Sequence, residues 1–160
     1  MNSVQLHLAL THVPVILTLT ALVMMLTGLI RKQQSTLKIA NIILVIAALI
    51  TIPVYFSGEG AEEVAEKITG VSEGAIEEHE EIAKFSFLGV LISGVFALAS
   101  LFFSMGKWGK AIRVLTLLSG LVASGLFIQT AHLGGTIRHT ELNGNSISAT
   151  TSPEDDSDND

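Results

Sequence analysis

The chain has 160 residues, of which 49% are hydrophobic and 15% are charged, and its mean hydropathy is positive, which together fall outside the usual range of a soluble domain of this size. It contains no cysteine, which excludes disulfides, thiolate metal ligands and covalently attached c-type haem. No nucleophile triad, phosphate-binding loop or nucleic-acid-binding patch occurs in it, so we expect no nucleic-acid partner.

Four apolar stretches separate the clusters of charge along the chain. They cover residues 6–30, 37–56, 82–105 and 111–133, and a helix of about 20 residues crosses roughly 30 Å of hydrocarbon. The first stretch has no basic segment before it, and its basic pair Arg31-Lys32 follows it, the reverse of a secretory signal peptide. We therefore predict an all-α fold, a membrane four-helix bundle with up-down topology.

The polar segments complete this predicted organisation. Between the second and third stretches, "GEGAEEVAEKITG" has Val64, Ala65 and Ile68 on one side, which predicts a short amphipathic outer helix lying on the bilayer surface. The chain ends in "TSPEDDSDND", which is acidic and poor in apolar residues and so favours a disordered, solvated tail. We predict a four-span domain over residues 1–140 and a disordered acidic tail over residues 141–160.

The distribution of basic residues predicts the orientation of the spans. The connections after the first and third stretches hold six of the nine Lys and Arg residues, namely Arg31, Lys32, Lys38, Lys107, Lys110 and Arg113. By the positive-inside rule these two connections are cytoplasmic. Both termini and the acidic second connection are then expected to face outward.

The histidines gather on the predicted outer side. His12 and His132 each lie 19 residues from a basic residue of the inner side, Arg31 and Arg113, and are therefore expected at one level, about 28 Å above it. Further out, in the interface or just above it, we expect His7, His79 and His139. An ionisable group within hydrocarbon is costly and usually faces the bundle interior and a partner, which favours a functional role for His12, whereas an interfacial His7 is ordinary.

Antiparallel neighbours in a four-span bundle bring the start of the first span beside the end of the fourth. The third span opens on the same face, so His12, His132 and His79 are expected to converge from three helices. Their neighbours have two interpretations. Gly134 and Gly135 either cap the last helix or let a bulky group approach the backbone. The glutamates around His79 form either a solvated acidic face or a carboxylate shell that fixes the tautomer of the histidine.

Small residues on the third and fourth spans also have two interpretations. Gly89, Ser93 and Gly94, and Gly120, Ser124 and Gly125, usually indicate close helix packing and less often space for a flat macrocycle. Arg138 is expected above that space, where it could pair with a propionate or a lipid headgroup.

Three motifs carry a family resemblance: "HLALTHVPV" on the first span, "SGEGAEEVAEKITGVSEGAIEEHEE" before the third, and "HLGG" closing the fourth. Together they resemble a family of small bacterial four-span membrane proteins with H-x4-H-x-P and (G/A)-H-L-G-G motifs, some of which occur alongside electron-transfer or c-type cytochrome domains. The resemblance covers residues 6–139. The matching positions are His7, His12, Pro14, His79, His132, Gly134, Gly135 and His139. Thr136 and Ile137 depart from the longer apolar or aromatic ending of relatives, and the resemblance implies haem association in the inner membrane.

The leading hypothesis is a membrane b-type cytochrome. It holds haem b, with two haems conceivable, ligated by two of His12, His132 and His79, because bis-histidine ligation needs no cysteine and suits electron transfer. It exchanges one electron with a quinol or an outer-face redox protein. The sequence is typical of an electron carrier or binding subunit rather than a stand-alone enzyme.

Two alternatives remain open at this stage. Three histidines, His12, His132 and His79, together with Glu78 or Glu81, could hold zinc or copper, or the chain could be a structural subunit of a larger complex or a homo-oligomer. The complete set of candidate cofactor-binding residues is His12, His132, His79, His7, His139 and Arg138.

Overall fold

The computed structural model describes residues 3–65, 73–103 and 106–138. It contains five helices, α1 (Ser3–Leu10), α2 (His12–Ile30), α3 (Gln34–Ala65), α4 (Glu73–Phe102) and α5 (Gly106–Arg138). No strand occurs in this part of the chain. The predicted tail, 141–160, and the candidate His139 lie outside the described residues, and so does the end of the predicted amphipathic segment.

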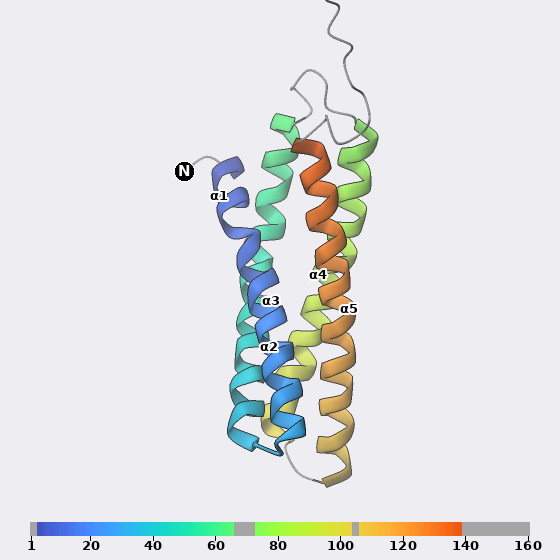
Figure 1. Ribbon diagram of the computed structural model, residues 1–160. Helices are drawn as coiled ribbons and strands as arrows, with labels where there is room; N and C mark the ends of the chain where they lie inside the picture. Colours follow the sequence, from blue (N-terminus) through green and yellow to red (C-terminus); the bar gives the residue numbers. More distant parts are fainter. Residues whose placement is uncertain (1–2, 66–72, 104–105, 139–160) are drawn as a thin grey trace, which may run out of the picture.

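The helices form an up-down bundle, as predicted (Figure 1). α3 packs between α2 and α4, α4 packs against α5, α2 closes the ring more sparsely against α5, and α1 lies along α3. The start of α1, the end of α3, the start of α4 and the end of α5 all lie at one end of the bundle (Figure 1). We call this the histidine end, because His7 and His79 belong to the helix segments found there.

Four helical segments are long and apolar enough to cross a membrane: His7–Ile30, Gln34–Val64, Glu73–Phe102 and Gly106–Thr136. Large apolar side chains cover the outside of the bundle, among them Ile16, Val23, Leu49, Val95 and Val122, each at least half exposed. An apolar exterior of this kind is compatible with contact to lipid. The four segments indicate a multi-pass membrane protein.

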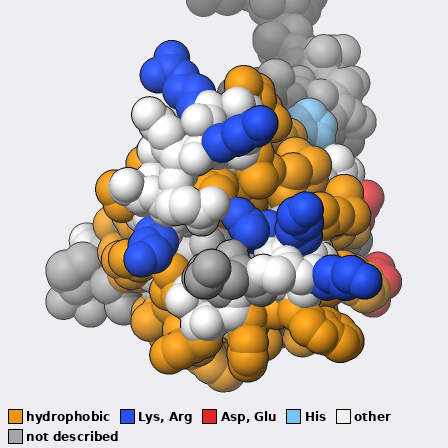
Figure 2. All heavy atoms as spheres, turned by 90° about the horizontal axis from the view of Figure 1, so that it is seen from below, with side chains coloured by type: hydrophobic (Ala, Val, Ile, Leu, Met, Phe, Trp, Pro, Cys, Tyr) orange, Lys and Arg blue, Asp and Glu red, His pale blue; other side chains and the backbone are white. Residues whose placement is uncertain are grey.

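The opposite end of the bundle carries basic side chains (Figure 2). The exposed members are Arg31, Lys32, Lys38, Lys107 and Lys110. The turn from α2 to α3 lies here and is closed by the Gln33 N–H, which donates to the Gly28 carbonyl, and the Lys32 N–H, which donates to that of Leu29. Lys32 takes a positive φ of 53°, so this is a Schellman cap in which lysine holds the place usually taken by glycine. We call this the basic end.

Small and hydroxyl-bearing residues make the helix contacts close. A Cβ built on Gly94 of α4 would lie 2.5 Å from the Cβ of Ala48 on α3. Thr18, Thr51 and Ser93 are buried and donate to the carbonyl four residues earlier in their own helix, which satisfies their hydroxyls without water. The interpretation of the small residues as helix-packing faces therefore holds for Gly94.

One local feature agrees with the sequence expectation and one differs. The first span stays helical through Thr11, whose N–H donates to the His7 carbonyl at 2.9 Å, although Pro14 has no N–H to donate to the Leu10 carbonyl. The predicted amphipathic helix does not begin as a separate element: residues 58–65 continue α3 to Ala65. Alanine and glutamate favour helix, and Gly58 and Gly60 are not sufficient to end one that is already formed.

Candidate functional site

His7 is held by the last turns of α3. Its Nδ1 lies 3.1 Å from the Val54 carbonyl oxygen and 3.2 Å from Ser57 Oγ. A carbonyl oxygen can only accept, so the contact between His7 Nδ1 and Val54 is a hydrogen bond when Nδ1 carries the hydrogen. The Ser57 hydroxyl lies 2.7 Å from the same carbonyl and donates to it, which is consistent with this tautomer and, in a neutral imidazole, leaves the lone pair on Nε2.

This arrangement is the one that protein histidines use when they bind a metal. A ligating imidazole usually donates its second ring N–H to a carbonyl or carboxylate, which fixes the tautomer and the ring orientation and raises the basicity of the ligand. No hydrogen bond reaches Nε2 of His7 from the described residues. His7 therefore has its Nδ1 engaged by the protein and its Nε2 available.

His79 is the second partly buried histidine of the histidine end. It lies on α4, where its ring interacts electrostatically with His7 and makes a backbone hydrogen bond with Thr130 of α5. Its Nδ1 is buried and makes no hydrogen bond among the described residues. The Thr130 backbone is therefore the one polar partner that the described residues offer this ring.

Each of these two rings rests on a glycine of the helix that follows. A Cβ built on Gly58 of α3 would lie 3.3 Å from His7 Cε1, and one built on Gly134 of α5 would lie 3.2 Å from His79 Cε1. The absence of a side chain at these positions lets an imidazole sit directly on the helix backbone. For Gly134, close approach of a bulky group is thus the interpretation that the structure supports, whereas nothing lies within 4 Å of a Cβ at Gly135.

His12 and His132 occupy different positions. Both side chains are exposed on the outside of the bundle, so the predicted convergence of His12 and His132 with His79 in the bundle interior is wrong. The one polar contact of His12 in the described structure is with Thr11 Oγ1, 3.4 Å from its Nδ1. Pro14, two residues further along, is buried, and two residues turn a helix by about 200°, so His12 points away from the buried stripe.

The sequence left two interpretations of the glutamates around His79, a solvated acidic face or a carboxylate shell for the imidazole. The structure favours the solvated face. Glu78 and Glu81 are exposed, and Glu80 pairs with Lys84 at 2.8 Å. A hollow of about 330 Å³ lies beside them and is lined by Glu62, Glu73, Ile76, Glu77 and Glu80. Within residues 3–65, 73–103 and 106–138, no group of three or more histidine, aspartate or glutamate side chains is placed to hold a metal ion.

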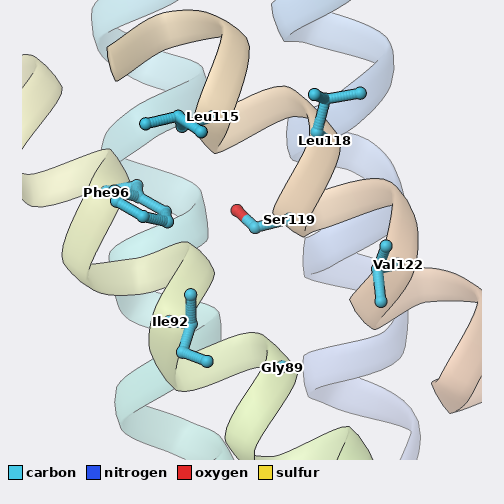
Figure 3. A pocket seen from close by; sticks show the side chains of 7 residues that line it. All are labelled: Gly89, Ile92, Phe96, Leu115, Leu118, Ser119 and Val122. Atoms are coloured by element: carbon cyan, nitrogen blue, oxygen red, sulfur yellow. The ribbon is translucent and has the colours of Figure 1, made fainter. Parts of the chain in front are cut away.

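A second hollow lies on the flank of the bundle, between α4 and α5 (Figure 3). It measures about 280 Å³ and is lined by Gly89, Ile92, Phe96, Leu115, Leu118, Ser119 and Val122. The Ser119 hydroxyl donates to the Thr116 carbonyl at 3.2 Å, and no ionisable side chain lines the hollow. Its chemistry suits a hydrocarbon chain, and it contains no ligand for a metal.

Sequence reasoning missed three parts of the site: Gly58, the Val54 carbonyl and the Ser57 hydroxyl. A backbone carbonyl leaves no trace in a sequence, but the "SGEG" segment was visible as two glycines just after an apolar run. The side chain of Arg138 lies outside what the structure describes, although its backbone ends α5.

Comparison with known proteins gives no relative from which a role could be transferred. No family model matches the chain, and neither a curated protein nor a solved structure is significantly similar to it.

Proposed function

We propose that this multi-pass membrane protein is a b-type cytochrome that holds haem b between imidazoles at the histidine end of the bundle. One observation carries the proposal: the Val54 carbonyl engages Nδ1 of His7, no hydrogen bond reaches its Nε2 from the described residues, and the ring of a second histidine, His79, interacts with it electrostatically from another helix. When bound, the haem would supply one reversible electron transfer.

The chemistry of the donors fits that group. The chain has no cysteine, so any haem is held by non-covalent contacts and axial ligands alone. Gly58 and Gly134 let the two imidazoles lie against the helix backbone, which supports a fixed position for both rings. Two neutral imidazoles are the axial pair that favours electron transfer over ligand chemistry.

The hypothesis from sequence proposed two of His12, His132 and His79 as the axial ligands. Burial and hydrogen bonding favour His79 from that set and add His7 as its partner. His12 and His132 face outward and would need a second chain or a lipid-side group to share a ligand. Roles for His139 and Arg138, including a contact with a haem propionate, stay predictions of the sequence.

The alternative is a zinc or copper ion. Two imidazoles supply half of a tetrahedral zinc site, and the exposure of Glu78 and Glu81 does not favour their completing it. A structural subunit of a larger complex is the third candidate, and the apolar flank of the bundle leaves room for neighbouring chains or a homo-oligomer. The two partly buried imidazoles, His7 and His79, favour haem over both alternatives.

The proposed orientation follows from the basic end (Figure 2). Basic loops are retained on the cytoplasmic side, so the histidine end and both termini face outward from a bacterial inner membrane. At that level the partner would be a quinol or an outer-face redox protein. The hollow between α4 and α5 is apolar enough to accept the tail of a quinol or a lipid.

A visible spectrum of the purified full-length protein tests the proposal. A Soret band with sharp reduced α and β bands is the expected result, because low-spin bis-imidazole haem has this spectrum. Metal analysis of the same sample tests the alternative. About one equivalent of zinc or copper without a Soret band would contradict the haem hypothesis and support a metal-ion site. A protein with neither group, even after incubation with haemin, would be a scaffold.

A further inference from the structure

The apolar hollow between α4 and α5 lies in the half of the bundle that adjoins the basic end. On α5 (Gly106–Arg138), its lining begins at Leu115, nine residues from the start of the helix, and ends at Val122, 16 residues from the other end. On α4 the lining ends at Phe96, six residues before the helix itself ends. In a membrane the hollow therefore opens to the hydrocarbon of one leaflet, on the side of the basic end.

Two exposed aromatic side chains continue the lining toward the basic end. Trp108 is 79% exposed and precedes Leu115 by seven residues and Ser119 by 11, a spacing that places the three on one face of α5. Phe103 is 60% exposed and follows Phe96 by seven residues, and its N–H still makes a helical hydrogen bond 2.9 Å long. Tryptophan is enriched where hydrocarbon meets the lipid headgroups, so Trp108 marks that boundary.

Lysines follow on the same helix. Lys107 is exposed and precedes Leu118, which lines the hollow, by 11 residues, or about three helical turns. Lys110, also exposed, lies one turn further along. Every Asp and Glu of the chain lies within residues 59–81 or 141–160, so the described part of the basic end has no carboxylate to pair with these lysines. An anionic group of the membrane would supply the opposite charge.

The distance from this cation to the far end of the hollow matches the thickness of one leaflet. Lys107 precedes Val122 by 15 residues, which corresponds to about 22 Å of helix. Half of a bilayer, including its headgroups, measures about 20–22 Å. A phospholipid whose headgroup lies at Lys107 would therefore lay an acyl chain along the hollow and pass Trp108 where the chain begins.

We propose that the hollow and the lysines beyond it bind one anionic phospholipid. The apolar lining takes an acyl chain, and Lys107, with Lys110 one turn away, takes the anionic headgroup. A zwitterionic lipid fills the hollow equally well but has no net negative charge. A quinol whose tail entered the same lining from this end would have its headgroup at the basic end, away from His7 and His79. The site is independent of the proposed haem.

Trp108 is the only tryptophan of the chain, so its fluorescence reports on this site directly. The full-length protein is reconstituted into phosphatidylcholine vesicles in which a small fraction of the lipid carries bromine on its acyl chains, as either phosphatidylglycerol or phosphatidylcholine. Bromine quenches tryptophan fluorescence on contact. We expect quenching to show a preference of about fivefold for the anionic lipid, the effect of one basic side chain near an anionic surface.

Two substitutions separate the headgroup from the acyl chain. Lys107→Gln removes a charge and leaves the hollow intact, whereas Ser119→Phe fills the hollow and leaves every charge in place, so that no seated chain holds the headgroup beside the lysines. Each should lower the preference to twofold or less. The matched controls, which should keep the preference, are Lys38→Gln at an exposed lysine of α3 and Leu121→Phe at an exposed position of α5 outside the hollow.

Four results would overturn the proposal. Equal quenching by the two brominated lipids would exclude an anionic site, and an unchanged preference in Ser119→Phe would show that charge alone draws lipid to the whole basic end. Relief of the quenching by one equivalent of an isoprenoid quinone would assign the hollow to a quinol tail. A Trp108 that neither lipid quenches would assign it to a second copy of the chain.

Discussion

A histidine removed from water needs a partner for each ring nitrogen, and this requirement separates the histidines that the structure describes. His7 meets the Val54 carbonyl through Nδ1, and His79 meets the backbone of Thr130. His12 and His132 are exposed and place no such demand on the fold. The two histidines proposed to bind one haem, His7 and His79, are therefore the two that the bundle partly buries.

The glycine beneath His79 provides a test at this scale. Gly134→Ala would place a Cβ 3.2 Å from His79 Cε1, closer than a ring tolerates without moving. We expect haem affinity to fall roughly tenfold, the scale on which changes just outside the ligands act. Titration of haemin into the purified variant measures it. Gly135→Ala is the matched control, because its Cβ meets nothing within 4 Å, and an equal loss in both variants would contradict the account.

At the scale of helices, the sequence predicted the four spans and the order of their packing but not which way each histidine faces. The length of an apolar stretch predicts a membrane-spanning helix, and the basic loops predict on which side of the membrane that helix begins. The depth of His12 and His132 was counted from Arg31 and Arg113, and depth says nothing of rotation about the helix axis. Rotation could have been predicted from Pro14 and Thr18, which are buried and lie seven and eleven residues after His7, a spacing that places all three on one helix face.

Some components of the site could not have been predicted in this way. The partner of His7 is a main-chain carbonyl, and its identity depends on how α1 lies along α3. The amphipathic segment was predicted to be separate because of its charge, but helix continuity is decided by backbone hydrogen bonds, and α3 continues to Ala65.

The close crossing of α3 and α4 makes a prediction about the stability of the bundle. Gly94→Ala would bring two Cβ atoms to 2.5 Å, so the helices must separate, and we expect a loss of about 1–3 kcal/mol in the free energy of unfolding. Unfolding in mixed detergent micelles measures this quantity.

A second substitution at the same crossing isolates the cause. Adding Ala48→Gly to Gly94→Ala removes the opposing Cβ and should restore at least half of the lost stability, as expected for residues in direct contact. Gly125→Ala, whose Cβ meets nothing within 4 Å, is the control and should be nearly neutral. If the double variant is no more stable than Gly94→Ala, steric contact at this crossing is not the cause.

At the scale of the whole molecule, the bundle has a basic end and a histidine end, and its orientation is open to direct measurement. Since the chain has no cysteine, single cysteines can be introduced without background. We expect Lys32→Cys and Lys107→Cys to react with a membrane-impermeant maleimide only after the cell membrane is opened, and Glu77→Cys to react in intact spheroplasts. The reverse pattern would place the histidine end in the cytoplasm and remove the proposed outer-face partner.

The central claim is that His7 of α1 and His79 of α4 hold a shared haem. The most direct measurement is the reduced visible spectrum of four single variants, His7→Ala, His79→Ala, His12→Ala and His132→Ala, loaded with haem under identical conditions. The account predicts that the sharp low-spin α band disappears from the first two and persists in the last two. Loss of that band from His12→Ala or His132→Ala, with its retention in His7→Ala and His79→Ala, would contradict it.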